Sequence, residues 1–221
     1  MKIPGILGGL GPKITAKIYL ALAMQDSQEY PGLLISNVSF PKEFENEIIE
    51  NSKNCDIMIP YLSKSIEQLK RAGADFVVIP CNTLHLLLLK LRKSFSIEFV
   101  DLIEETSKEL AKKGYKKIGI LSTTKTRNEK LYDSINKGIE IIYPFEEEQR
   151  EISGIIVKII RNQQKTEDKS YLNEIIKKLI KRGAENVVLA CTDLAEAIKI
   201  NPNVLDTTEI LINSIKEKMK S

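Results

Sequence analysis

Two cysteines, Cys81 and Cys191, occupy matching places in two copies of one sequence pattern. Each follows a short β-branched run and precedes an apolar stretch with helical spacing, so each is expected where a buried strand ends and a helix begins. The free N–H groups and the dipole at the start of a helix favour an anion there and lower the pKa of a thiol. A lone cysteine at a strand end is more often a small buried hydrophobe. Two at duplicate positions favour a pair of reactive thiols.

A pair of like thiols suits inversion at a carbon acid. One base removes the proton from one face of the carbon, and the conjugate acid of the other returns a proton to the opposite face. Because such a reaction runs in both directions, the two groups should be chemically alike. Pyridoxal phosphate would need a Schiff-base lysine and a phosphate-binding site, and neither has a recognisable setting here. The residues therefore favour a reaction without a cofactor.

The repeat around the cysteines extends over much of the chain. The segment LSKSIEQLKRAGADFVVIPCNTL, which starts at Leu62, aligns without gaps with LNEIIKKLIKRGAENVVLACTDL, which starts at Leu172. The segment GILGG at Gly5 likewise matches GILST at Gly119. The chain is therefore interpreted as a tandem duplication.

The elements that must position the cysteines are those of an α/β protein with parallel strands, because short β-branched runs alternate with amphipathic stretches. Strands are predicted at 3–7, 33–38, 76–80, 117–121, 139–143 and 187–190, and crossover helices at 61–72 and 171–182. Gly73 and Gly183 end these helices, where a left-handed residue is favoured. In such sheets ligands bind beyond the carboxyl ends of the strands, where both cysteines are expected.

The predicted fold is a pair of similar α/β lobes with parallel sheets, related by a pseudo-twofold axis, with the active site in the cleft between them. The N-terminal lobe is assigned to residues 1–98 with a returning C-terminal helix at 207–221, and the C-terminal lobe to residues 99–206. The segment 96–103 is interpreted as the crossover between the lobes. A helix over 206–219 is expected to pack back on the first lobe.

Composition argues against several other functions. The 221 residues carry a net charge of +3 and no basic block interleaved with aromatic residues, so nucleic acid is not an expected partner. The longest aliphatic run, Leu86 to Leu89, is far below the roughly 18 to 20 apolar residues of a membrane span. With 3 cysteines, no CxxC pair and 1 histidine, no metal is expected. The odd cysteine count and the absence of a signal-peptide pattern predict reduced thiols in the cytoplasm.

Four segments follow one another along the chain, namely GILGGLGPKITAKIY, VVIPCNTLH, GILSTTKTRNEKLY and VVLACTDL. They resemble the successive signature segments of the aspartate/glutamate racemase superfamily, and most of all those of its aspartate racemase branch. Glutamate racemases are less similar, because they usually open with a DSGVGG-type segment. The resemblance implies two cysteine bases in a cleft between two Rossmann-like lobes, a small amino-acid substrate, no cofactor and commonly a homodimer.

The resemblance also assigns roles to individual residues. Cys81 and Cys191 match the catalytic pair. Asn82, Thr83 and Thr192 match positions that bind the α-carboxylate and the amino group in the family. The remaining substrate-binding positions are the glycine turn at Gly9 and Leu10 and the threonine-rich turn at Thr123 and Thr126.

Three departures from the family pattern concern the surroundings of the thiols. Asp193 stands where Glu is usual, and Lys125 replaces a usual Gly in the threonine turn. Aspartate racemases commonly hold the side-chain carboxylate with an Arg between the second strand and the first cysteine, whereas the first Arg of this chain is Arg71. Lys42 and Arg161 are the candidates to supply that charge.

His85 lies four residues after Cys81, so on a helix the two would share a face. The histidine could polarise the thiol, or it could cap or pack beneath the site, and the sequence leaves both open.

The leading hypothesis is a racemase for aspartate, with glutamate possible. A maleate-type isomerase or a decarboxylase of the same superfamily would use a single thiol for its proton step. A two-lobed protein that binds a dicarboxylate without turning it over is the third hypothesis. A dinucleotide site at Gly8 to Gly11 is not favoured, because Pro12 follows at once and the GxGxxG spacing fails.

Overall fold

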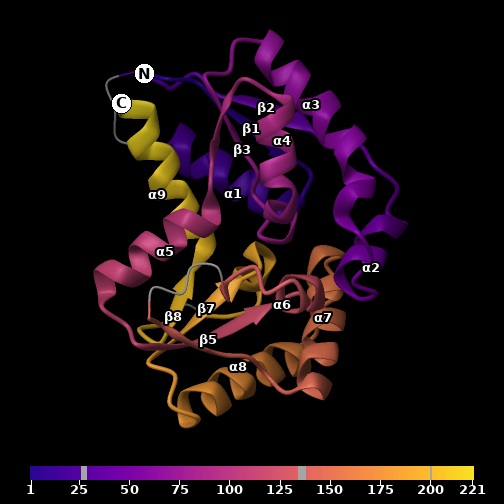
Figure 1. Ribbon diagram of the computed structural model, residues 1–221, viewed down its shortest axis with the longest axis vertical. Coiled ribbons are helices and arrows are strands. Elements are labelled where there is room, and N and C mark those ends of the chain that lie inside the picture. The colour runs from indigo at the N-terminus through magenta and orange to yellow at the C-terminus, as the bar shows by residue number, and fades with distance from the viewer. Residues whose placement is uncertain (26–28, 134–137, 200) are drawn as a thin grey trace. The chain divides into compact units, whose positions relative to one another are not determined.

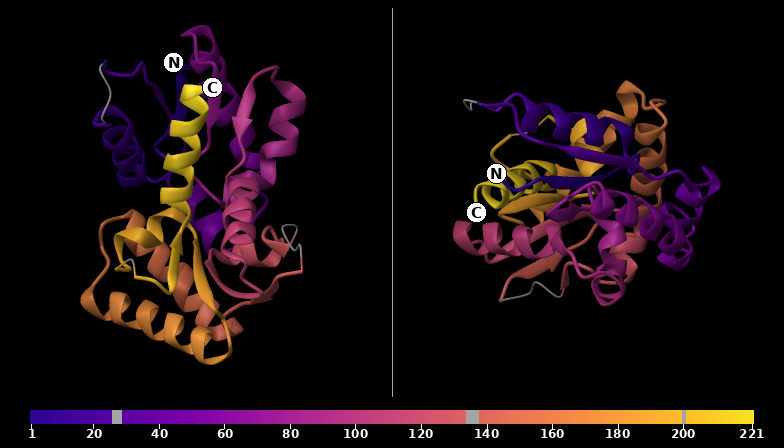
Figure 2. Two further views of the ribbon diagram at one scale, coloured as in Figure 1. Left: turned by 90° about the vertical axis from the view of Figure 1, so that its left-hand side faces the viewer. Right: turned by 90° about the horizontal axis from the view of Figure 1, so that it is seen from above.

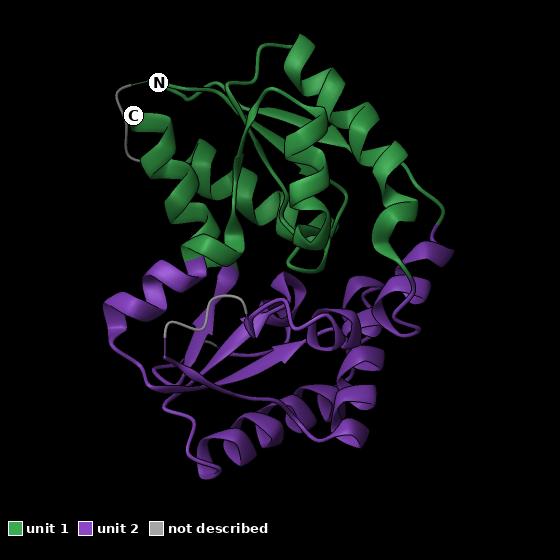
Figure 3. Cartoon of the chain, viewed as in Figure 1, with its two compact units in different colours: residues 1–41, 54–105, 208–221 green, residues 42–53, 106–207 purple. Residues whose placement is uncertain are grey.

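The computed structural model describes residues 1–25, 29–133, 138–199 and 201–221. The chain forms two compact units (Figure 3). Unit 1 consists of Met1–Pro41, Asn54–Glu105 and Thr208–Ser221, and unit 2 of Lys42–Lys53 and Thr106–Thr207. Each unit has a four-stranded parallel sheet, with the order β2-β1-β3-β4 in unit 1 and β6-β5-β7-β8 in unit 2. The equivalent orders confirm the predicted duplicated α/β fold.

Unit 1 is built on a sheet whose strands are β1 (Pro4–Gly8), β2 (Leu34–Asn37), β3 (Phe76–Val78) and β4 (Glu98–Val100) (Figure 1). Its helices are α1 (Pro12–Ala23), η1 (Cys55–Met58), α3 (Ile59–Arg71), η2 (Thr83–Leu87), α4 (Leu88–Ser94), the start of α5 (Leu102–Lys113) and nearly all of α9 (Thr207–Lys220). A core of buried aliphatic side chains joins α1 and α9 to this sheet. The Lys2 N–H donates to the carbonyl of Met219 at 2.9 Å, which ties the two termini together, as Figure 2 shows.

Unit 2 repeats this plan with β5 (Lys117–Ser122), β6 (Glu140–Ile142), β7 (Asn186–Ala190) and β8 (Val204–Asp206). Its helices are α2 (Glu43–Ile49), α6 (Thr124–Asn128), α7 (Glu146–Ile160), α8 (Thr166–Lys181), η4 (Thr192–Glu196) and the rest of α5. Isoleucine and leucine side chains of α7 and α8 pack on β5 and β7 to form its core. In the part of the chain that the structure describes, no helix is long and apolar enough to cross a membrane.

The two crossover helices form because their apolar residues recur every three or four positions and so line one face. In α3 the buried face is Leu62, Ile66 and Leu69, and in α8 it includes Leu172 and Leu179. The glycines that follow have left-handed backbones, with φ of 94° at Gly73 and 98° at Gly183. This confirms the predicted helix ends.

Two strands were not predicted. The segment 96–103, interpreted as a crossover, contains β4, which pairs with β3. The other unpredicted strand, β8, pairs with β7. Each is a three-residue strand at the edge of its sheet and pairs with a single neighbouring strand.

Residues 42–53, here called the strap, follow β2 of unit 1 along the chain but belong to unit 2. Within unit 2, the helix α2 packs on α7 and α6. One Arg161 guanidinium nitrogen donates to Asn46 Oδ1 at 2.7 Å, and Lys125 Nζ donates to the carbonyl of Ser52 at 3.2 Å. The strap is therefore held near both of its ends by cationic side chains of unit 2.

Candidate functional site

Cys81 lies in unit 1, three residues beyond the end of β3 and two residues before η2. Its side chain is partly exposed, whereas the neighbouring Asn82 and Thr83 are buried. The strand end and the start of η2 thus present the thiol at the carboxyl edge of the sheet, as parallel α/β sheets present their ligand-binding residues. Cys55, the other cysteine of unit 1, is buried.

His85 joins two backbone groups of unit 1. The Leu102 N–H donates to Nε2 at 3.0 Å, so Nε2 is unprotonated and the proton of the neutral ring lies on Nδ1. Nδ1 then donates to the carbonyl oxygen of Cys81 at 2.8 Å. Burial lowers the pKa of His85, although the bond to Cys81 and the charge of Asp101 oppose this shift. The neutral His85 ring therefore acts as a clamp on the Cys81 backbone: Nδ1 bonds to the Cys81 carbonyl, and Nε2 bonds to the Leu102 N–H.

The glycine turn of unit 1 needs Gly9 for two reasons. Its backbone is left-handed, with φ of 82°, and a Cβ at this position would lie 2.6 Å from Asn37 Oδ1. The Gly9 N–H donates to Thr15 Oγ1 at 3.2 Å, and Leu10 is buried. Asn37, at the end of β2, thus contacts this turn, and the sequence analysis did not identify it.

Cys191 lies in unit 2 at the position that matches Cys81. It directly follows β7, occupies the N-cap of η4 and is buried. Its carbonyl accepts the N–H of Leu194 at 3.1 Å. Thr192 and Asp193, the first residues of η4, are buried as well.

The threonine turn of unit 2 links β5 to α6. Thr123 caps α6, because its Oγ1 accepts the Thr126 N–H at 3.1 Å, and its hydroxyl lies 3.1 Å from that of Thr126. Both side chains are buried. The turn is also held from α7, where Gln149 Nε2 donates to the Ser122 carbonyl at 2.8 Å and Ser153 Oγ accepts the Thr124 N–H at 2.9 Å. Gln149 and Ser153 lie far from the turn in sequence and carry no motif, so sequence reasoning missed them.

Lys125, the departure within this turn, is buried and directed to the strap. Its Nζ bonds to the Ser52 carbonyl and forms an ion pair with Glu129 at 2.7 Å. The Lys125 ammonium group therefore stabilises unit 2 by joining α6 to the strap.

The two candidate cations for a distal carboxylate, Lys42 and Arg161, both lie near Glu45 of the strap. Burial raises the pKa of Glu45, and the charges of Arg161 and Lys42 oppose that rise. Arg161 also donates to Asn46. The structure thus gathers two cations and one carboxylate at the start of the strap.

The predicted site residues therefore form two groups, each described within its own unit. Unit 1 holds Gly9, Leu10, Cys81, Asn82, Thr83 and His85, and unit 2 holds Thr123, Thr126, Arg161, Cys191, Thr192 and Asp193. Among the described residues, no group of three or more His, Cys, Asp or Glu side chains is placed to hold a metal ion.

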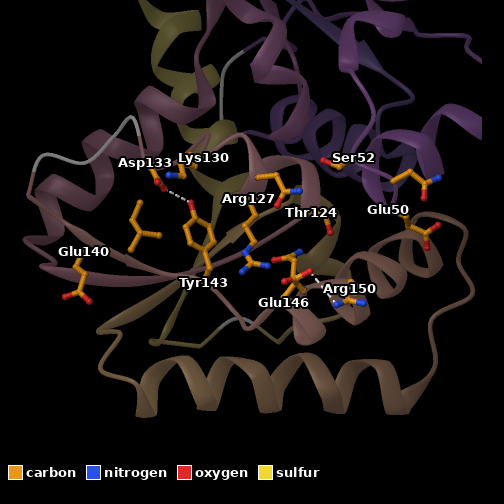
Figure 4. A pocket seen from close by; sticks show the side chains of 14 residues that line it. Glu50, Ser52, Thr124, Arg127, Lys130, Asp133, Glu140, Tyr143, Glu146 and Arg150 are labelled. Atoms are coloured by element: carbon orange, nitrogen blue, oxygen red, sulfur yellow. Dashed lines mark hydrogen bonds and ion pairs between the residues drawn. The ribbon is translucent and has the colours of Figure 1, made fainter.

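Unit 2 also contains an open pocket of about 990 Å³, shown in Figure 4. It is lined by residues of the strap, α6, the segment after α6, β6 and the start of α7. None of the predicted site residues lines it. The lining consists of Glu50, Asn51, Ser52, Thr124, Arg127, Asn128, Lys130, Asp133, Glu140, Ile141, Tyr143, Glu146, Gln149 and Arg150.

Known proteins are similar to this chain in sequence and in fold. The chain is 25% identical over 226 residues to the broad-specificity amino-acid racemase RacX of Bacillus subtilis, with 95% of each protein covered. A crystal structure of an aspartate racemase homologue from Pyrococcus horikoshii has a TM-score of 0.78 and 27% identity, with 100% of both chains covered. The Picrophilus torridus aspartate racemase has a TM-score of 0.76 and 23% identity, covering 100% of this chain and 95% of that one.

The family match spans almost the whole chain. Residues 7–215 match the family described as Asp/Glu/hydantoin racemase, a range that includes both cysteines, the glycine turn and the threonine turn. The duplicated pair of parallel sheets agrees with the fold of the solved relatives. The chain therefore belongs to the Asp/Glu/hydantoin racemase family.

Proposed function

We propose that the chain racemises an acidic amino acid, aspartate before glutamate, by proton transfer at Cα between the thiols of Cys81 and Cys191. The observation that carries the proposal is the equivalent placement of the two residues. Each follows the strand that is third in its sheet order, β3 or β7, and each precedes a 3-10 helix. Chemically alike groups at matching positions are what a reversible inversion needs.

In the proposed reaction one cysteine acts as thiolate and the other as thiol. The thiolate takes the α-proton, and the electron pair of the C–H bond passes into the α-carboxylate as an enolate. The thiol then donates its proton to the opposite face, so that the two cysteines exchange protonation states in each turnover. Donors near the enolate oxygens stabilise the negative charge that develops there. Asn82, Thr83, Thr123, Thr126 and Thr192 are proposed for that role.

His85 enters this proposal only through the Cys81 backbone, because its ring nitrogens bond to the Cys81 carbonyl and the Leu102 N–H. It is a positioning residue for the first thiol. Asp193 is proposed to support the second thiol, Cys191, and Arg161 is proposed to lie beside the distal carboxylate of the substrate.

A broad substrate range is the second candidate, and one feature of the strap favours it. Glu45 lies near both Arg161 and Lys42, so its carboxylate offsets part of the positive charge that a second substrate carboxylate would use. The similarity to the broad-specificity racemase RacX supports the same possibility. Assays should therefore include neutral amino acids beside aspartate and glutamate. The resemblance further suggests a homodimer in the cytoplasm, and sedimentation would measure the oligomeric state.

The test follows deuterium entry at Cα, separately for L- and D-aspartate, in Cys81→Ser and Cys191→Ser without added pyridoxal phosphate. Each variant should lose racemisation, because one base cannot act on both faces, and each should exchange the α-hydrogen of one enantiomer only. The buried Cys55 gives a matched control, and Cys55→Ser should racemise at close to the wild-type rate.

Several results would count against the proposal. Near wild-type racemisation by either variant, or equal exchange of one enantiomer by both, would exclude the two-thiol assignment. A single essential cysteine would favour an isomerase or decarboxylase of the superfamily. Calorimetric binding of aspartate without deuterium entry into any amino acid tested would favour a non-catalytic binding protein.

A further inference from the structure

Two polar side chains of α7 hold the backbone on both sides of Thr123 in unit 2. Gln149 Nε2 donates to the Ser122 carbonyl at 2.8 Å. Ser153 Oγ accepts the Thr124 N–H at 2.9 Å and lies 2.8 Å from Thr124 Oγ1. Because Gln149 and Ser153 are four residues apart, they share one face of the helix, and Gln149 Nε2 lies 3.4 Å from Ser153 Oγ. The two side chains therefore form one network that fixes the peptide groups before and after Thr123.

This network lies on a helix face that is otherwise aliphatic. Gln149 and Ser153 are each 1% exposed, whereas the other buried residues of α7 are isoleucine and valine. Gln149 Oε1 has no hydrogen-bond partner among the described residues, and turning the amide would set this oxygen against the Ser122 carbonyl. A buried acceptor without a partner destabilises the fold, and an aliphatic side chain would avoid that penalty. The network is therefore better explained by the turn that it holds than by the stability of the core.

The matching turn of unit 1 is held in a similar way. In the repeat Gly9 corresponds to Thr123, and the Gly9 N–H donates to Thr15 Oγ1 of α1 at 3.2 Å. Counted from the same alignment without a gap, Thr15 corresponds to Glu129. This residue is the C-cap of α6, which has only 5 residues, and its carboxylate pairs with Lys125. Each turn is thus held by a helix hydroxyl that accepts one of its N–H groups, and in unit 2 that hydroxyl comes from α7.

We propose that Gln149 and Ser153 are positioning residues for the threonine turn, which set its donors at the substrate carboxylate. The inference rests on the proposed racemisation, in which Thr123 and Thr126 are donors near the enolate oxygens. The negative charge on these oxygens grows when Cα loses its proton. A displaced donor therefore weakens the transition state more than the bound substrate. A displacement of about 1 Å can slow a reaction by about a hundredfold.

The experiment measures kcat and KM of Gln149→Met by circular dichroism, with the amino acid that the wild type racemises fastest. Methionine has nearly the shape of glutamine. It removes the unpaired Oε1, but it also leaves the Ser122 carbonyl without the Nε2 donor, so the two effects on stability oppose each other and the urea midpoint should stay close to that of the wild type. The kcat should fall by about tenfold or more, while KM should rise by less than about threefold.

Ser153→Ala is the second variant and should act in the same direction, because the Thr124 N–H loses its acceptor. Alanine suits the interior of a helix, so α7 itself should be unaffected. The double variant should lose less activity than the product of the two single losses, since both side chains act on one turn.

Asn186→Leu is the matched control within unit 2. The Asn186 amide is also buried, its Oδ1 has no hydrogen-bond partner among the described residues, and its Nδ2 donates to the Pro202 carbonyl at 2.9 Å. Asn186 begins β7, whereas Cys191 follows the other end of that strand. This variant should therefore leave kcat and KM unchanged.

Three results would overturn the inference: an unchanged kcat in Gln149→Met, a loss confined to KM, or an equal loss of kcat in Asn186→Leu. Losses of kcat that follow a fall in the urea midpoint across the variants would overturn it too, because they would report a structural role. A wild type that racemises no amino acid would overturn the proposed function and this inference with it. An active wild type with an unaffected Gln149→Met would overturn this inference alone, so the two failures are distinguished.

Discussion

His85 is a residue whose role only the structure decides, because its ring bonds to the backbone of both Cys81 and Leu102. The sequence placed His85 four residues from Cys81 and left its role open. Its second partner is the N–H of Leu102, which begins α5, and no local pattern predicts a bond across that distance. The cysteines themselves were predictable because the repeat marks them twice. Asn37, Gln149 and Ser153 were not, because each acts through contacts with residues distant in sequence.

We predict that His85 makes the stability of the protein depend on acidity. Burial lowers its pKa in the folded state, whereas the unfolded chain binds the proton near pH 6.5. The unfolded state therefore takes up more protons as the pH falls below about 6.5, and the free energy of unfolding decreases. Between pH 7.5 and 5.5 the wild type should lose about 1 kcal/mol more than His85→Gln in urea unfolding.

The comparison with His85→Gln cancels the contribution of carboxylates, which titrate in both proteins. Since the chain has 1 histidine, its ¹⁵N NMR signals are unambiguous and should show a neutral ring with the proton on Nδ1 at pH 6. Equal losses of stability in the two proteins, or a charged ring at that pH, would contradict the clamp.

At the scale of elements, the duplication repeats a packing contact as well as a pattern of residues. A Cβ at Gly5 of β1 would lie 2.8 Å from the Ala74 Cβ, just after α3, and 3.2 Å from the Leu69 Cβ of α3. A Cβ at Gly119 of β5 would lie 3.0 Å from Leu179 Cδ1 of α8. Matching helices, α3 and α8, therefore approach matching strands closely in both units. Repeats and apolar periodicity made these elements predictable, whereas the short strands β4 and β8 depend on pairing with β3 and β7.

Gly5→Ala should destabilise unit 1 by about 1–3 kcal/mol, because the neighbour that it meets is itself a Cβ fixed to the backbone. Gly119→Ala should cost less, since a leucine side chain can move aside. Gly154→Ala in α7 is the control: its Cβ would meet only Glu50 Oε1 at 3.8 Å, so it should stabilise by roughly 0.5–1 kcal/mol. Urea unfolding measures all three, and a neutral Gly5→Ala would refute the close approach.

At the scale of the whole molecule, the chain passes from one unit to the other at 41/42, 53/54, 105/106 and 207/208. The sequence could not assign the strap to unit 2, because the residues of α6 and α7 that contact it are more than 70 positions away along the chain. Lys125 was noted as a departure from the family pattern and Arg161 as a candidate cation for a distal carboxylate. Their bonds to Ser52 and Asn46 show that both side chains support the strap.

Lys125→Met should loosen the strap without unfolding unit 2, because the aliphatic stem is kept while the bonds to Ser52 and Glu129 are lost. A loss of about 1 kcal/mol in local stability would speed opening roughly fivefold. Trypsin should then cleave after Lys53 several-fold faster, as followed by mass spectrometry. Lys90→Met, which breaks the exposed pair with Asp56 in unit 1, is the control and should leave that rate unchanged. Equal rates in all three proteins would contradict the supporting role.

The strap also limits how genes of this family can recombine. A single exchange between two parents anywhere in residues 54–105 would leave the strap from one parent against α7 from the other. Ile48 is buried and Ile49 packs against the core of unit 2, so in such a chimaera these side chains would pack against core residues from the other parent. Viable chimaeras should therefore inherit codons 42–53 together with codons 106–207, although an entire stretch of unit 1 separates them in the gene.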